Sequence, residues 1–93
     1  MKNMDKEEKD ICLTIVEIIK RIFDIPEELL GQEKWDMCLT SKEIGLDGID
    51  LVYLLFEIER QYGIRFSSAM FDNHGFNTIM RIVGAVQRTT YKR

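Results

Sequence analysis

The sequence is poor in the residues that catalysis and cross-linking most often use. Its 93 residues include one proline, one tryptophan, one histidine and two cysteines. The single histidine is not part of a recognisable Ser-His-Asp or Cys-His arrangement, and the two cysteines lack the spaced Cys and His partners of a zinc site. We therefore expect no catalytic residue and no metal site, and we interpret His74 as a loop residue. Cys12 and Cys38 are interpreted as reduced thiols, with a disulfide or a reactive Cys38 as alternatives.

Long apolar runs and an excess of positive charge are also missing. No stretch approaches the roughly 20 uninterrupted apolar residues of a membrane span, and residues 1–10 do not lead into the apolar block of a signal peptide. The net charge is −3, whereas nucleic-acid-binding domains normally carry a basic face. We expect a cytoplasmic protein that binds neither membranes nor nucleic acids. A local basic end, interpreted as a solvated tail and helix C-terminal charge, comprises Arg81, Arg88, Lys92 and Arg93.

The chain is rich in apolar residues at helical spacing. It is 45% hydrophobic, which suits one small domain over residues 1–93. An amphipathic stripe predicts a first helix over about residues 5–23, and it comprises Ile11, Ile15, Ile18, Ile19 and Ile22. Pro26 predicts a stop and a restart, with a short helical turn through Leu30. Residues 31–46 show no sustained period and predict a long loop that is anchored by Trp35, Met37 and Leu39.

The longest periodic segment runs from Asp47 to Tyr62. Asp47 is suited to cap its N-terminus, and Gly63 stands where a C-cap is expected. A short helix over 67–72 and a turn over 73–75 are predicted to follow. Asn77 is then predicted to cap a last helix whose apolar stripe comprises Ile79, Ile82, Val83 and Val86. The predicted fold class is all-α, with three main helices, a short one, and a long loop between the first two main helices.

The helix over 47–62 has two apolar faces. The first is the expected core face, and it comprises Leu51, Leu54, Leu55, Ile58 and Tyr62. The second lies roughly 150° away, and it comprises Ile49, Val52, Tyr53, Phe56 and Arg60. Its polar borders are Asp50, Glu57 and Gln61 on one flank and Glu59 on the other. Either the long loop with Trp35 folds over part of this second face, or the face is a partner-binding patch.

Four short segments, taken in order and spacing, resemble the acyl carrier protein family over about residues 8–87. They are residues 25–29, 44–47, 57–64 and 76–79. The resemblance implies a right-handed four-helix bundle with phosphopantetheine on a serine at the start of the second helix. It also implies that this helix is the main docking surface, through Ile49, Val52, Tyr53 and Phe56. The first loop is several residues longer than in typical members.

The departures from the family pattern lie at the start and along the face of this helix. Gly48, preceded by Asp47, occupies the position of the attachment serine, and Ser41 lies upstream and out of register. We therefore expect no 4'-phosphopantetheine unless Gly48 is an engineered replacement of serine. Tyr53 stands where carriers commonly have an acidic residue, and Arg60 lies in a region usually rich in glutamate. Docking to the basic patch of carrier-using enzymes should be weakened.

These observations favour a non-enzymatic, monomeric docking or accessory module for a biosynthetic or peptide-modifying enzyme. It is similar to carrier-related proteins of peptide-maturation systems that lack the serine. The partner is expected on the helix from about 47 to 62, and the candidate residues are Ile49, Asp50, Val52, Tyr53, Phe56, Glu57 and Arg60. One alternative is a genuine acyl or peptidyl carrier whose serine was replaced by engineering. Another is a stand-alone structural or regulatory domain without enzyme partners.

Overall fold

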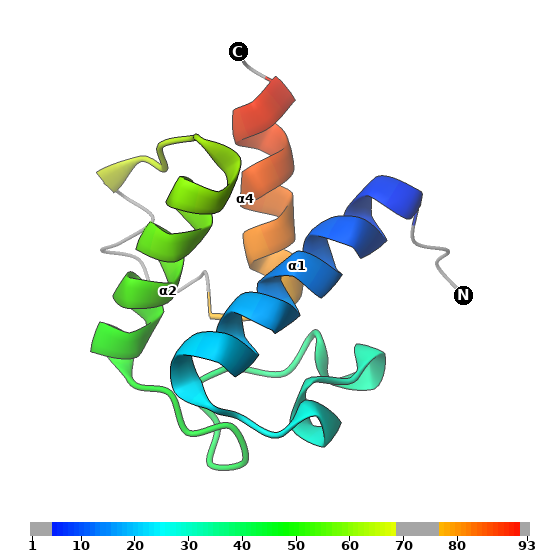
Figure 1. Ribbon diagram of the computed structural model, residues 1–93, viewed down its shortest axis with the longest axis vertical. Helices are drawn as coiled ribbons and strands as arrows, with labels where there is room; N and C mark the ends of the chain where they lie inside the picture. The colour runs from blue at the N-terminus through cyan, green and yellow to red at the C-terminus, as the bar shows by residue number, and fades with distance from the viewer. Residues whose placement is uncertain (1–4, 69–76, 92–93) are drawn as a thin grey trace.

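The helices of the protein are arranged around α1, with α2 and α4 packed against it (Figure 1). The computed structural model describes residues 5–68 and 77–91. This part of the chain contains no strand, and its elements are α1 (Lys6–Phe23), the 3-10 turns η1 (Glu27–Leu30) and η2 (Gln32–Lys34), α2 (Gly48–Tyr62) and α4 (Ile79–Tyr91). The predicted all-α class is confirmed. The short helix predicted over 67–72 falls largely outside the described residues, as do the turn with His74 and the last two residues of the basic end.

Helix α1 begins and ends where the apolar stripe predicted. The Asp5 carboxylate accepts a hydrogen bond from the Glu8 amide at 2.8 Å, and the Glu8 side chain accepts one from the Asp5 amide. This reciprocal pair is a capping box, which satisfies amide groups that have no partner within the helix. Asp24 ends the helix in the left-handed conformation, with φ of 55°. The predicted short turn before Leu30 is also present, as η1.

Helix α2 is capped at both ends by residues that the sequence suggested. The Asp47 carboxylate accepts a hydrogen bond from the Asp50 amide at 2.8 Å, and Asp50 returns the bond to the Asp47 amide. At the other end, Gly63 has φ of 63° and donates its amide to the Glu59 carbonyl. This left-handed conformation is adopted most readily by glycine, which has no Cβ atom. The direction in which the chain leaves α2 is therefore determined by Gly63.

The core forms where the apolar faces of α2 and α4 pack against α1. The predicted stripes of α1 and α4 and the predicted core face of α2 are buried, apart from the half-buried Ile22 and Tyr62. The innermost side chains are Ile15, Ile19, Leu54, Ile58, Ile79, Ile82, Val83 and Val86. Because the core uses only one face of α2, its other face is left outside.

The connection between α1 and α2 is packed onto the bundle and joined to the start of α4. Trp35 is buried, and its Nε1–H donates to the Leu30 carbonyl at 3.0 Å. The Met80 amide donates to the Trp35 carbonyl at 3.1 Å, and the Leu39 amide donates to the Asn77 carbonyl at 2.7 Å. The predicted anchors Trp35 and Leu39 are thus buried, while Met37 is half-buried.

The prediction that Asn77 caps the last helix is wrong, because the cap is Thr78. The Arg81 amide donates to Thr78 Oγ1 at 3.1 Å, and the Ile82 amide donates to the Thr78 carbonyl. Asn77 is instead engaged with the long loop, through its carbonyl to Leu39 and through Nδ2 to Cys38 Sγ at 3.6 Å. The loop contact holds Asn77 one residue before the capping position, which Thr78 occupies.

Candidate interaction surface

The second apolar face of α2 exposes three of its four apolar side chains. Ile49 is 78% exposed, Tyr53 58% and Phe56 51%, while Val52 is half-buried. These four residues are called the α2 strip below. The long loop leaves the three exposed members uncovered, and its tryptophan is buried with its Nε1–H bonded to the Leu30 carbonyl. The interpretation in which Trp35 shields this face therefore does not apply to Ile49, Tyr53 or Phe56.

One flank of the α2 strip carries an ion-pair cluster between two helices. Glu57 lies between Arg60 on its own helix, at 3.4 Å, and Arg21 on α1, at 3.8 Å. Its side chain is largely shielded, whereas that of Arg60 is 82% exposed. The sequence placed Glu57 on a polar border but did not reveal Arg21, which lies off the apolar stripe of α1. An ion pair between two helices depends on how the helices pack. Residue spacing within either helix therefore does not predict it.

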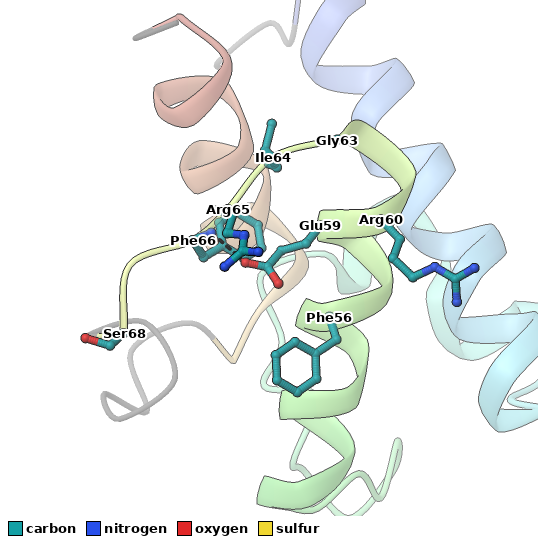
Figure 2. A pocket seen from close by; sticks show the side chains of 8 residues that line it. All are labelled: Phe56, Glu59, Arg60, Gly63, Ile64, Arg65, Phe66 and Ser68. Atoms are coloured by element: carbon teal, nitrogen blue, oxygen red, sulfur yellow. Dashed lines mark hydrogen bonds between the residues drawn. The ribbon is translucent and has the colours of Figure 1, made fainter.

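A groove lies beside the C-terminal half of α2 (Figure 2). It has a volume of about 680 Å³ and lies between α2 and the segment after Gly63. Glu59 joins the two sides, since its Oε2 accepts a hydrogen bond from the Phe66 amide at 2.6 Å. Ile64 and Phe66 are buried by this arrangement. The sequence placed Glu59 on a polar border, and its structural role depends on the chain reversal at Gly63.

The first turn of α2 bears no nucleophilic side chain. Residues 44–52 include no serine, threonine, tyrosine or cysteine. Gly48 is exposed, and a Cβ atom added there would meet nothing within 4 Å. The upstream hydroxyl of Ser41 is buried and has no hydrogen-bond partner among the described residues. The first turn of α2 therefore presents no hydroxyl.

The two cysteines occupy different environments and are not bonded to each other. Cys12 is buried in α1, with its Sγ 3.7 Å from Met80 Sδ. Burial raises the pKa of Cys12 to about 12, and the nearby carboxylates of Glu8 and Asp36 add to the effect. Cys38 is exposed. The absence of a bond between them agrees with the interpretation of both as free thiols, and their reduced state and the reactivity of Cys38 remain predictions.

Two further features concern metals and membranes. The structure groups no three His, Cys, Asp or Glu side chains within metal-binding range among residues 5–68 and 77–91. In the same ranges, no helix has the length and apolar character needed to cross a membrane. Asp47, Asp50, Glu57 and Glu59 are instead engaged in caps, ion pairs and a backbone hydrogen bond.

Comparison with known proteins identifies the family. The family model for the phosphopantetheine attachment site matches residues 14–86. This match covers most of the chain, which therefore belongs to the phosphopantetheine-binding, acyl carrier family. No curated protein and no solved structure gives a significant match. The chain is thus an acyl or peptidyl carrier-like protein, from a family that normally carries 4'-phosphopantetheine and whose domains are generally non-catalytic.

Proposed function

We propose that this carrier-like protein has no phosphopantetheine attachment serine and acts as a non-catalytic docking or accessory module. Its partner would be a biosynthetic or peptide-modifying enzyme in the cytoplasm, bound by a monomer of the chain. The observation that carries the proposal is the combination found on α2. The helix exposes Ile49, Tyr53 and Phe56, while its first turn offers no hydroxyl.

The start of α2 does not fit a covalently attached prosthetic group. Attachment through a phosphodiester requires an accessible hydroxyl, and Gly48, which we place at the serine position, has none. Ser41 is a poor substitute because its Oγ is buried. The family's usual chemistry therefore has no acceptor here, and the function is assigned to the surface.

The α2 strip has the composition of a protein-binding surface. Aromatic side chains are enriched at the centres of interfaces, and polar residues at their rims. Here Tyr53 and Phe56 lie in the strip, and Asp50, Glu57 and Arg60 lie beside it. Exposed apolar side chains gathered on one helix commonly mark interaction sites in soluble proteins.

Loading with coenzyme A tests the first half of the proposal. The purified protein, incubated with coenzyme A and a broad-specificity phosphopantetheinyl transferase, should show no mass increase in intact-protein mass spectrometry. An adduct of roughly 340 Da would contradict the proposal. The matched variant is Gly48→Ser, which the open space around Gly48 accommodates without a clash.

The result for Gly48→Ser distinguishes two histories of the site. Rapid loading of this variant would favour a genuine carrier whose serine was replaced, because the scaffold would still be recognised. Continued resistance would favour a surface that has diverged for another use. The alternative of a genuine carrier with a replaced serine is retained because a serine side chain fits at Gly48.

A comparative pull-down tests the docking surface. The wild-type protein is compared with Phe56→Asp and with Leu13→Asp, which places the same charge at an exposed apolar residue on α1. We expect mass spectrometry to find one enzyme enriched by the wild type and by Leu13→Asp and lost with Phe56→Asp. Retention of every interaction by Phe56→Asp would instead support a stand-alone structural or regulatory domain.

A further inference from the structure

The groove beside α2 continues the α2 strip at its C-terminal end. Phe56 belongs to both, since it is the last apolar member of the strip and also lines the groove. Figure 2 shows its ring on the side of α2 below Glu59 and Arg60, with the segment of Arg65 and Phe66 across from it. A partner segment that lies on Tyr53 and Phe56 would therefore extend into the groove.

The sides of the groove are held in place before any partner arrives. The left-handed Gly63 reverses the chain, and the Ile64 amide donates to the Glu59 carbonyl at 3.1 Å. The hydrogen bond from the Phe66 amide to the Glu59 carboxylate adds a second tie. Binding to a preformed groove avoids the entropic cost of ordering the segment.

The exposed charges around the groove are mainly positive, although the chain as a whole carries −3. Arg60 and Arg65 line the groove and are exposed, and Arg65 makes no ion pair with any described residue. The two nearby glutamates are half-buried and engaged, and Glu59 itself lines the groove. Glu57 is shared by two arginines, and one Glu59 oxygen accepts the Phe66 amide.

We propose that the groove and the adjoining strip bind an acidic amphipathic segment of the partner enzyme. Its apolar side chains would cover Tyr53 and Phe56, and its carboxylates would pair with Arg60 and Arg65. Guanidinium groups bind carboxylates in planar, two-point contacts, which makes arginine suited to this recognition. The inference rests on the proposed docking function and adds the charge of the partner surface. That surface would be acidic, whereas enzymes that use ordinary carriers present a basic patch.

Two synthetic helical peptides test this charge preference. They share leucine and phenylalanine at i, i+3, i+4 and i+7, and they carry either glutamate or lysine at the flanking positions. Binding is followed by amide chemical shifts of the full chain at two salt concentrations. We expect the glutamate peptide to bind at least about tenfold more tightly than the lysine peptide and to shift the amide resonances of Phe56, Ile64 and Phe66. Its affinity should fall at high salt.

The variants separate charge from fold. The double variant Arg60→Glu with Arg65→Glu should bind the glutamate peptide at least about tenfold more weakly than the wild type does. The matched control, Lys6→Glu with Lys42→Glu, makes the same charge change at exposed residues that do not line the groove and should leave binding unchanged. Preserved helical circular dichroism in both double variants would show that the fold is intact.

Several outcomes would overturn the inference. They are equal or tighter binding of the lysine peptide, no binding of the glutamate peptide at millimolar concentration, and shifts remote from the groove. Shifts of the groove residues on simple concentration of the free protein would assign the site to a second copy of the chain. If Phe56→Asp abolishes enzyme capture while the arginine reversal leaves capture unchanged, the proposed function stands and the inference on partner charge fails.

Discussion

At the scale of single residues, the glycines at the two ends of α2 differ in what the backbone requires. Gly63 has a positive φ of 63°, and most residues that carry a Cβ atom adopt such an angle only with strain. Gly48 has no positive φ, and a Cβ there would stand in open space. Gly63 is thus needed for the path of the chain, whereas Gly48 is not.

This contrast predicts opposite effects of the same substitution. Gly48→Ala should raise the free energy of unfolding by about 0.4–1 kcal/mol, because alanine restricts the unfolded chain and favours helix. Gly63→Ala should lower it by about 1–2 kcal/mol, because alanine is strained in the left-handed region. Urea unfolding followed by circular dichroism measures both. A loss of stability in Gly48→Ala would show that the glycine has a structural role that the open space does not reveal.

Cys12 makes the stability of the protein depend on pH in the alkaline range. Its pKa rises from 9.0 to about 12 on folding, so the folded state holds the thiol proton more tightly than the unfolded state. The contribution of this thiol to the free energy of unfolding is fully present below pH 9. It decreases as the pH rises from 9 toward 12, by at most about 1.4 kcal/mol per pH unit. The difference in unfolding free energy between wild type and Cys12→Ala should therefore shrink between pH 9 and 10.5. A constant difference would contradict the assignment.

At the scale of elements, α2 has one face that holds the fold together and another that is open to partners. Both faces carry isoleucine, so the same substitution compares them. Ile58→Val, at a fully buried residue, should cost about 0.5–1.5 kcal/mol, because it removes a packed methylene group. Ile49→Val, at a residue that is 78% exposed, should change stability by less than about 0.5 kcal/mol. Equal losses in urea unfolding would mean that the exposed face is covered in solution.

The sequence predicted α1 and α2 well because their signals are local. The stripe of α1, the capping Asp47 and the terminal Gly63 all act within a few residues of where they stand. The choice between Asn77 and Thr78 as a cap was decided by the distant Leu39 and could not be read locally.

The same distinction applies to the candidate site. The exposed strip follows from the periodicity of α2, and the structure places Ile49, Tyr53 and Phe56 on the outside as that periodicity implied. The groove depends instead on the chain reversal at Gly63 and on the bond between Glu59 and Phe66. Because that bond joins a helix to the segment that follows it, periodicity within the helix gives no indication of it.

At the scale of the whole molecule, the long first connection is part of the bundle. Trp35, Leu39 and Leu46 are buried, and backbone hydrogen bonds join the loop to the beginning of α4. Detaching the loop would expose these side chains and break the bonds to Asn77 and Met80. The loop and the helices should therefore unfold together.

The single tryptophan allows this cooperativity to be measured. Trp35 fluorescence reports on the loop, and far-ultraviolet circular dichroism reports on the helices. We expect the two urea transitions to coincide, as they do for a two-state domain. A fluorescence transition at clearly lower urea than the helical one would show that the loop separates first.

The buried hydroxyl of Ser41 has a consequence for how the chain tolerates change. An unpaired buried polar group costs about 1–3 kcal/mol, and Ser41 Oγ has no hydrogen-bond partner in the described part of the loop. The backbone turn around it does not need the hydroxyl, since the Gly45 amide bonds the Ser41 carbonyl. Replacement of Ser41 by alanine should therefore raise the free energy of unfolding, which urea unfolding would measure. It could offset the destabilising substitutions that accumulate when a docking surface evolves toward a new partner.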